Sequence, residues 1–334
     1  MSETYGAIRL ERIAESFRAA ADIVDLPLTE PGPGQIRVRN RHCGINGIFD
    51  TQIARNAVDY VPITLPTFTG VEAIGLVDAV GDGVTGFAVG DAAVTVRFTG
   101  GYREANIGPE SQFAKAPSVS RDYLALASTG VSALLALEQI GQVRDGETVA
   151  ISAAAGGLGH MLVQLALLRG CHVIAVCGGK RKCDFVASLG AQRVIDYRSE
   201  DVGAVLAAEY PKGIDVAIDT VSGAIFDAFL ANIAYHGRLV VGGAASDLEG
   251  RPEVVTAPRI AHSIYYKGAS VRGFMNGLLT PHWDHARARL FQLYADGRIA
   301  VTFDDRPFAG LPGIYDAVER LLSGQSMGKV VVDL

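Results

Sequence analysis

The sequence predicts an α/β protein with two domains, a β-rich module followed by a doubly wound parallel sheet covered by helices. The chain has 334 residues, which is typical of two domains of about 100–200 residues each. Hydrophobic residues make up 49% of the chain and charged residues 20%, so both domains can bury a sizeable core. The pattern of elements changes near residue 122, where we place the first boundary.

The first domain is predicted to be a compact barrel or sandwich, because its strands are short and turns lie between them. The turn at 31–34 is followed by Gln35–Arg39, which alternates polar and apolar residues as a half-buried strand does. Further strands are predicted at 73–80 and 92–96. We expect this domain to span residues 1–122.

The second domain is predicted from strands that alternate with helices after Glu147. The expected strands are 148–153, 172–177, 193–196, 214–219 and 238–241. They are nearly continuous in Val, Ile and Ala, as strands buried on both faces are. We assign 123–267 to this domain and expect about 268–334 to complete the first one, with extension of the parallel sheet as the alternative. That tail is predicted to hold a strand at 269–273, helices at 283–295 and 314–323, and a closing strand at 329–334.

Charge and cysteine content exclude several classes of protein. The net charge is −6, which leaves no basic excess to bind nucleic acid. The four cysteines, at 43, 171, 177 and 183, have no metal-binding spacing and favour a reducing compartment. The first 15 residues lack an apolar signal-peptide core, and glycines interrupt the uncharged stretch 148–168. We therefore expect a cytoplasmic protein with no membrane and no nucleic-acid partner.

A glycine-rich turn carries the strongest chemical signal. Gly156, Gly157, Leu158 and Gly159 lie between a buried strand and a helix. A dinucleotide diphosphate needs glycines for close backbone approach, together with exposed N–H groups at the start of a helix. A tight strand–helix turn that binds no ligand can have the same sequence, but the further strand–helix units that follow favour nucleotide binding.

The residues after the second strand predict NADPH rather than NADH. An NAD site usually has an acidic residue about 20 residues beyond the glycine turn, where it binds the ribose hydroxyls. Here the strand 172–177 ends in Gly178–Lys182, with three cations and no carboxylate before Asp184. Cations attract a 2′-phosphate that a carboxylate would repel. A solvated basic helix start is the alternative interpretation.

Together these motifs resemble the zinc-independent branch of the medium-chain dehydrogenase/reductases, and within it the quinone-oxidoreductase group. The resemblance spans nearly the whole chain. It rests on the glycine turn and on the following segments: 70–72, 86–91, 153–157, 178–182, 193–197, 209–213, 270–274 and 328–332. It implies a GroES-like catalytic domain, a Rossmann domain for NADPH, and a homodimer.

The resemblance also implies which residues hold the cofactor. Lys182 and Tyr197 match residues that hold the adenosine 2′-phosphate, whereas Gly242 and Phe274–Asn276 match residues near the nicotinamide. The cofactor set implied in this way is Asn46, Gly178, Lys182, Tyr197, Thr220, Gly242, Phe274, Met275, Asn276 and Ser326, in addition to the glycine turn. The chain departs from relatives at three of its positions, because Gly178 replaces a common serine, Ala105 a tyrosine and Ser326 an asparagine.

No metal is predicted. Zinc-dependent members of this fold use cysteine and histidine ligands, but this chain has Asn46 in place of the cysteine and Val71 in place of the histidine. Cys43 beside His42 is interpreted as a buried strand residue. The alternative interpretation is an alcohol dehydrogenase, which bound zinc would favour.

Without a Lewis acid, hydride addition to a carbon–carbon double bond conjugated to a carbonyl is the best-supported chemistry. Asn46 could bind the substrate carbonyl or the ribose, and Tyr60 could donate the proton. His160, in the first turn of the phosphate-side helix, is expected on the helix surface. The predicted substrate is an enone, enoyl thioester or quinone. A quinone reductase proper and a catalytically weak NADPH-binding regulator remain alternatives.

Overall fold

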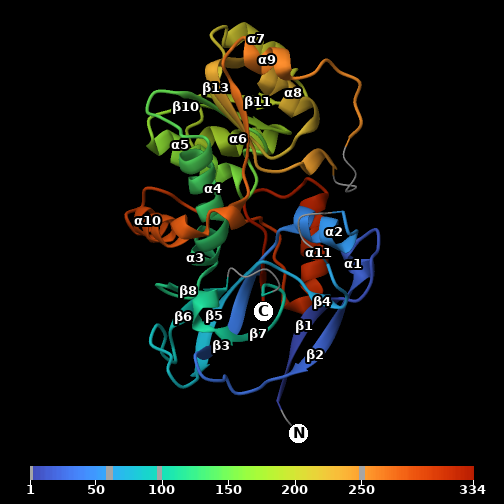
Figure 1. Ribbon diagram of the computed structural model, residues 1–334, viewed down its shortest axis with the longest axis vertical. Coiled ribbons are helices and arrows are strands. Elements are labelled where there is room, and N and C mark those ends of the chain that lie inside the picture. Colours follow the sequence, from blue (N-terminus) through green and yellow to red (C-terminus); the bar gives the residue numbers. More distant parts are fainter. Residues whose placement is uncertain (1–2, 58–62, 96–99, 248–252) are drawn as a thin grey trace. The chain divides into compact units, whose positions relative to one another are not determined.

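The computed structural model describes residues 3–57, 63–95, 100–247 and 253–334, which form two compact units (Figure 1). The first comprises Met1–Ser128 and Phe303–Leu334, and the second comprises Thr129–Asp247 and Arg251–Thr302. This division differs from the predicted boundaries at 122 and 268. The reason is that β14 (Ser270–Gly273) pairs in parallel with β13 (Ile233–Val241), so the chain stays in the second unit for another strand and helix.

The first unit is built from antiparallel strands. One sheet has the order β15-β3-β5-β6-β8, with β7 also paired to β3, and a smaller sheet has the order β2-β1-β4. The strands are β1 (Thr4–Leu10), β2 (Ala21–Pro27), β3 (Gln35–Gly44), β4 (Thr67–Phe68), β5 (Glu72–Val80), β6 (Ala92–Thr95), β7 (Ala105–Pro109), β8 (Phe113–Ala116) and β15 (Val331–Asp333). Because β15 pairs with the end of β3, the C-terminal residues belong to this unit.

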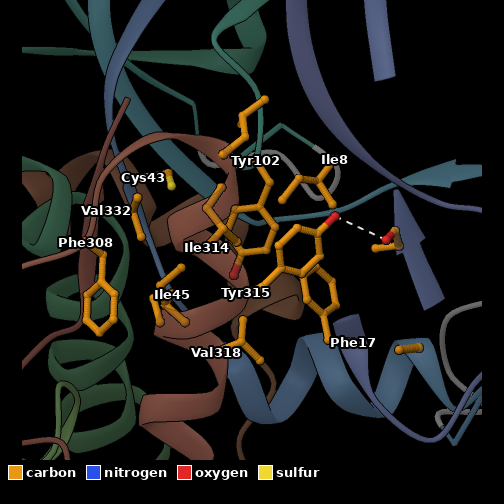
Figure 2. Close-up of a cluster of buried hydrophobic side chains, with 14 of the residues drawn as sticks. Ile8, Phe17, Cys43, Ile45, Tyr102, Phe308, Ile314, Tyr315, Val318 and Val332 are labelled. Atoms are coloured by element: carbon orange, nitrogen blue, oxygen red, sulfur yellow. Dashed lines mark hydrogen bonds between the residues drawn. The ribbon is translucent and has the colours of Figure 1, made fainter. Parts of the chain in front are cut away.

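The described residues of the first unit form the α-helices α1 (Phe17–Ala20), α2 (Gly47–Ala54), α3 (Arg121–Ala125) and α11 (Gly310–Leu322). Its core brings together residues from both ends of the chain (Figure 2). The ring of Phe17 lies 5.9 Å from those of Tyr102 and Tyr315, centroid to centroid. The Tyr315 hydroxyl donates a hydrogen bond to the Ala21 carbonyl oxygen. Aromatic rings at this separation gain edge-to-face attraction in addition to area burial.

The second unit contains a six-stranded parallel sheet with the order β11-β10-β9-β12-β13-β14. Its remaining strands are β9 (Thr148–Ile151), β10 (His172–Cys177), β11 (Arg193–Asp196) and β12 (Ile214–Asp219). The order reverses between β9 and β12, and ligands of such sheets bind beyond the carboxyl ends of the strands at this point. The predicted doubly wound sheet is therefore confirmed.

The helices of the second unit are α4 (Val131–Leu135), α5 (Gly159–Leu168), α6 (Lys180–Ser188), α7 (Val202–Glu209), α8 (Gly223–Ala231), α9 (Ala261–Tyr265) and α10 (Trp283–Ala295). Helices α5, α6, α7 and α8 contact the sheet, whereas α10 packs on α4, and α4 packs on α5. Phe229 of α8 and Leu206 of α7 are fully buried against Ile174 and Leu239 of the sheet. Because successive strand residues point to opposite faces, strands covered on both sides need the continuous apolar runs seen in the sequence.

Among the described residues, one helical run is long and apolar enough to cross a membrane, judged by length and composition alone. It spans Arg121–Ile140, and 61% of its apolar window is buried inside the fold. A core helix of a globular protein passes the same test, so this run is weak grounds for a membrane. The uncharged stretch 148–168 is divided between β9 and α5, as the glycines predict.

Replacing Phe17 by alanine should destabilise the first unit by about 3–5 kcal/mol, because the change empties a tightly packed aromatic site. Ile23→Ala is the matched control, since Ile23 is 42% exposed and should cost roughly 0.5 kcal/mol or less. Urea unfolding of both variants measures the difference. Equal midpoints for the two variants would show that the Phe17 cluster does not hold this unit together.

Candidate cofactor and active site

The glycine turn leaves backbone donors open at the start of α5. Gly156 N–H donates to Ala153 O, and Gly156 O accepts from His160 N–H at 3.0 Å. In the described part of the chain, the N–H groups of Gly157 and Leu158 have no acceptor. Two open donors at the positive end of a ten-residue helix form a binding site for an anion such as a diphosphate.

Gly159 is required by close packing of the helix against the strand that precedes it. A Cβ atom there would lie 2.2 Å from Ala153 O and 2.6 Å from Ala154 Cα. Backbone atoms cannot yield to such a contact, so only glycine lets the helix begin this close to β9. The sequence prediction for this turn therefore agrees with the geometry that a dinucleotide needs.

The prediction for His160 is wrong, because this side chain is fully buried rather than at the helix surface. Its Nδ1 lies 2.9 Å from Gly156 O, and its Nε2 accepts a hydrogen bond from Thr302 N–H at 3.2 Å. These partners require the proton on Nδ1, so the imidazole is neutral. His160 ties the glycine turn to the segment that leaves the second unit.

Asp219 organises the carboxyl end of β12. Its fully buried carboxylate accepts from Ser152 Oγ at 2.7 Å, from Val221 N–H at 2.9 Å and from Ser222 N–H at 3.0 Å. Ser152 Oγ in turn accepts from Thr220 N–H at 2.8 Å. Sequence patterns did not single out Asp219 or Ser152, yet together they fix the backbone of Thr220, a predicted cofactor residue.

Three predicted cofactor residues meet beside this network. A Cβ atom on Gly242 would lie 3.6 Å from Thr220 Cγ2 and 3.7 Å from Phe274 Cδ1. Phe274 N–H donates to Val241 O at 2.8 Å, which keeps Phe274 at the end of the sheet. These residues therefore lie together at the carboxyl edge, where the resemblance places the nicotinamide.

Met275 and Asn276 follow directly. The Met275 side chain is 41% exposed. The Asn276 side chain already has partners, because its Nδ2 donates to Ser132 Oγ at 2.9 Å and its Oδ1 accepts from Trp283 Nε1 at 2.9 Å. The amide of Asn276 therefore holds the loop in place, and its backbone carbonyl oxygen also accepts from Leu279 N–H at 2.9 Å and from Trp283 Nε1 at 3.2 Å.

Gly178 and Tyr197 meet at the end of β10. A Cβ atom on Gly178 would lie 2.5 Å from Tyr197 Cζ, so the ring packs directly on the glycine backbone. This contact explains the departure from serine, because any side chain at 178 would displace Tyr197. Gly179 has φ +88°, a left-handed conformation that favours glycine, and its N–H donates to Asp196 Oδ1 at 2.8 Å.

Cations surround this turn. Lys182 is half-buried in the first turn of α6. Arg198, which sequence reasoning missed, has its Nη1 3.3 Å from the position of a Cβ on Gly179. In the sequence, the only indication that Arg198 belongs to this site was its position directly after Tyr197. Lys180 is paired with Asp184 at 2.7 Å and is highly exposed.

In the first unit, Asn46 is held by a buried ion pair. Lys329 Nζ lies 2.5 Å from Glu72 Oε1, and the two side chains are 4% and 0% exposed. Asn46 Nδ2 donates to Glu72 Oε1 at 3.2 Å, and Lys329 Nζ donates to Asn46 Oδ1 at 3.4 Å. An amide has two N–H bonds, so one donor of the half-buried Asn46 is left for a ligand.

Two other predicted residues of the first unit are less informative. Ser326 is half-buried in the turn between α11 and β15. Tyr60, the proposed proton donor, lies outside the described residues. Among the residues that are described, no three His, Cys, Asp or Glu side chains come together in a way that could hold a metal ion.

A buried acid lies one helical turn from Asn46. Asp50 is 2% exposed and accepts a short hydrogen bond from the hydroxyl of the fully buried Tyr102. Burial raises the pKa of Asp50 to about 7, although the hydrogen bond from Tyr102 and the charge of Lys329 oppose the shift. Cys43 is buried in β3, as predicted, and burial raises the pKa of its thiol.

Comparisons with known proteins agree with this geometry. Residues 157–292 match the family described as zinc-binding dehydrogenase, and residues 32–119 match the alcohol dehydrogenase GroES-like domain. Prostaglandin reductase-3 from Mus musculus is 35% identical over 333 residues, covering 97% of this chain and 88% of that protein. A probable quinone oxidoreductase from Leishmania amazonensis is 30% identical over 334 residues, covering 98% and 97%.

A solved structure extends the likeness to three dimensions. Escherichia coli quinone oxidoreductase in complex with NADPH superposes with a TM-score of 0.85 at 25% identity, covering 98% of this chain and 100% of that chain. The fold class predicted from the sequence is confirmed. The segments 153–157, 209–213 and 270–274 predict a particular likeness to prostaglandin reductase 3, and this likeness is confirmed as well.

Asp50→Asn should make stability less dependent on pH. The native state binds the Asp50 proton more tightly than the unfolded chain, whose carboxyl has a pKa near 3.8. The contribution of Asp50 to the free energy of unfolding is therefore largest below pH 3.8 and is lost as the pH rises through about 7. Asparagine keeps the acceptor for Tyr102 but does not titrate.

Urea unfolding at pH 5 and pH 8 measures this effect. From pH 5 to pH 8, we expect the free energy of unfolding of the wild type to fall by about 1 kcal/mol or more relative to that of the variant. A difference between variant and wild type that stays constant with pH would mean that Asp50 is ionised throughout.

Proposed function

The chain belongs to the quinone oxidoreductase group of the medium-chain dehydrogenase/reductase superfamily, and on this premise we propose that it uses NADPH to reduce carbon–carbon double bonds conjugated to a carbonyl. The observation that carries the proposal is the held amide of Asn46. This amide offers a hydrogen-bond donor at the position where zinc-dependent relatives have a cysteine ligand.

The cofactor residues fit NADPH. The open N–H groups of Gly157 and Leu158 suit the diphosphate, and Lys182 and Arg198 beside the Gly178–Gly179 turn suit a 2′-phosphate. The NADPH complex of the Escherichia coli relative supports the same assignment. When bound, NADPH supplies the hydride.

Asn46 is proposed to bind the carbonyl oxygen of the substrate through its remaining Nδ2–H. As hydride reaches the β-carbon, negative charge develops on this oxygen as an enolate. A fixed donor stabilises that charge more than it stabilises the neutral carbonyl. Lys329 and Glu72 contribute by holding the amide in one orientation, which lowers the cost of reorganisation.

The enolate then takes a proton at the α-carbon. Tyr102 is not available for this step, because its hydroxyl is buried and donates to Asp50. Solvent or Tyr60 is therefore proposed as the proton source. A quinone reductase proper is the second candidate, since the relative from Leishmania amazonensis carries that name. A regulator that binds NADPH without turnover is the third.

The protein should bind NADPH at least about tenfold more tightly than NADH, a difference of roughly 1.4 kcal/mol. Lys182→Ala should weaken NADPH binding by about tenfold and leave NADH binding unchanged, because only NADPH carries the 2′-phosphate. Lys180→Ala is the matched control on the same helix, since the Lys180 side chain is 87% exposed and lies against Asp184. Fluorescence titration measures the affinity of the wild type and both variants for NADPH and NADH. Equal affinity of the wild type for the two cofactors would contradict the assignment.

NADPH oxidation should be seen with simple enones and 2-enoyl-coenzyme A esters, giving saturated carbonyl products. Product analysis by mass spectrometry and NMR distinguishes the candidates, and chelator treatment should leave the rate unchanged. Hydroquinones as sole products would favour the quinone reductase, and no turnover on any substrate would favour the regulator. An allylic alcohol would overturn the mechanism, because hydride would have gone to the carbonyl carbon.

A further inference from the structure

Two cysteines lie next to each other at the adenosine end of the proposed cofactor site. Cys177 is the last residue of β10 and is 2% exposed, whereas Cys183 lies in the first turns of α6 and is half-buried. Their sulfur atoms are 3.4 Å apart, and a disulfide bond needs about 2 Å. The two other cysteines, Cys43 and Cys171, are both buried.

The chain between the two cysteines is the turn that carries the predicted 2′-phosphate residues, 178–182. This turn is held firmly on several sides. Gly178 packs on the Tyr197 ring, and Gly179 N–H donates to Asp196 Oδ1. Forming the bond draws the two sulfur atoms together by more than 1 Å. The part of this movement that side-chain rotation does not absorb falls on the turn and on its contacts with Tyr197 and Asp196.

We propose that Cys177 and Cys183 form a reversible disulfide that weakens binding of the cofactor's 2′-phosphate end. This inference rests on the proposed NADPH site. It assigns a redox modification to a pair of side chains that the reduction mechanism does not use. The two thiols lie on either side of Gly178–Lys182, so the modification acts on the turn that distinguishes NADPH from NADH.

The oxidation needs an external two-electron acceptor, such as a diazene or a small disulfide. The two thiols lose two protons and two electrons, and one S–S bond forms as the acceptor is reduced. With a disulfide oxidant, Cys183 reacts first because it is the more exposed sulfur, and Cys177 then displaces the leaving thiol. A dithiol reductant reverses the change.

The rate should rise with pH, because the thiolate is the reactive form. Burial raises the pKa of both thiols. Asp196, Asp184 and Glu200 raise that of Cys183 further, while Lys182 partly opposes the shift at Cys177. The pair is thus slow to oxidise at neutral pH, and a pH series of the oxidation rate reports on these groups.

The test is oxidation of the full-length protein with diamide, followed by blocking of free thiols and tryptic digestion. Trypsin cleaves after Lys180, Arg181 and Lys182, so a disulfide links two otherwise separate peptides, 170–180 and 183–193. We expect this linked pair in the wild type and in the control Cys171→Ala, which removes the other cysteine of the first peptide. It should be absent in Cys183→Ser.

NADPH affinity is then measured on reduced and oxidised protein. We expect oxidation to weaken NADPH binding by about tenfold or more, dithiothreitol to restore it, and Cys183→Ser to be unaffected by diamide. By linkage, bound NADPH should also make the disulfide less favourable at equilibrium, so that fewer linked peptides are found in a thiol–disulfide buffer that contains NADPH. Absence of the linked pair, or its presence with unchanged NADPH affinity, would overturn the proposal.

The two readouts separate this proposal from the proposed function. If the reduced protein fails to bind NADPH, then the cofactor assignment fails, while the peptide mass still reports whether the disulfide forms.

Discussion

The buried ion pair between Glu72 and Lys329 is the interaction on which the first unit and its candidate site depend. Desolvating two charges costs several kcal/mol for each ion, and only good geometry with further hydrogen bonds offsets this. Lys329 supplies those bonds by donating to Ile45 O at 3.1 Å and to Asn46 Oδ1. The pair therefore requires the C-terminal segment to return to the start of α2, and Asn46 is held as a consequence.

The second unit also contains a buried carboxylate whose hydrogen bonds hold a residue of the candidate site, and here the acid is Asp219. Asp219 is fully buried, and its carboxylate is satisfied by one hydroxyl and two backbone N–H groups at the carboxyl end of the sheet. In both units a buried carboxylate fixes a polar residue that is proposed to bind a ligand. This residue is Asn46 in the first unit and Thr220 in the second. Rigid placement of this kind is what a site needs when catalysis depends on fixed donors rather than on movement.

Local patterns predicted the parts of the fold that local physics decides. The glycine turn, the strand–helix alternation and the missing acid before Asp184 are all contained in short segments, and each could be interpreted without knowing its neighbours in space. The continuation of the parallel sheet to β14 was one of two alternatives that the sequence left open for the tail. Nothing within 269–273 tells whether that strand pairs with β13 or with the first domain, since the choice depends on long-range pairing.

Long-range contacts also account for what the site prediction lacked. Asn46 was identified by its position, but its partners Glu72 and Lys329 are distant in sequence, and neither segment reveals that it is buried. His160 was placed on the helix surface because its burial depends on Thr302, far along the chain. Gly178 was identified only as a departure from a common serine, and the sequence could not reveal that the Tyr197 ring fills the space that a serine would need.

The central claim is that the held amide of Asn46 binds the substrate oxygen as charge develops on it. The most direct test is the kcat/KM of Asn46→Ala for a simple enone such as 2-cyclohexenone at saturating NADPH. Loss of one such donor is expected to lower the rate by about 10²–10³, while the Glu72–Lys329 pair keeps the unit folded. A value within about threefold of the wild type would contradict the claim, because the transition state would then be stabilised without this residue.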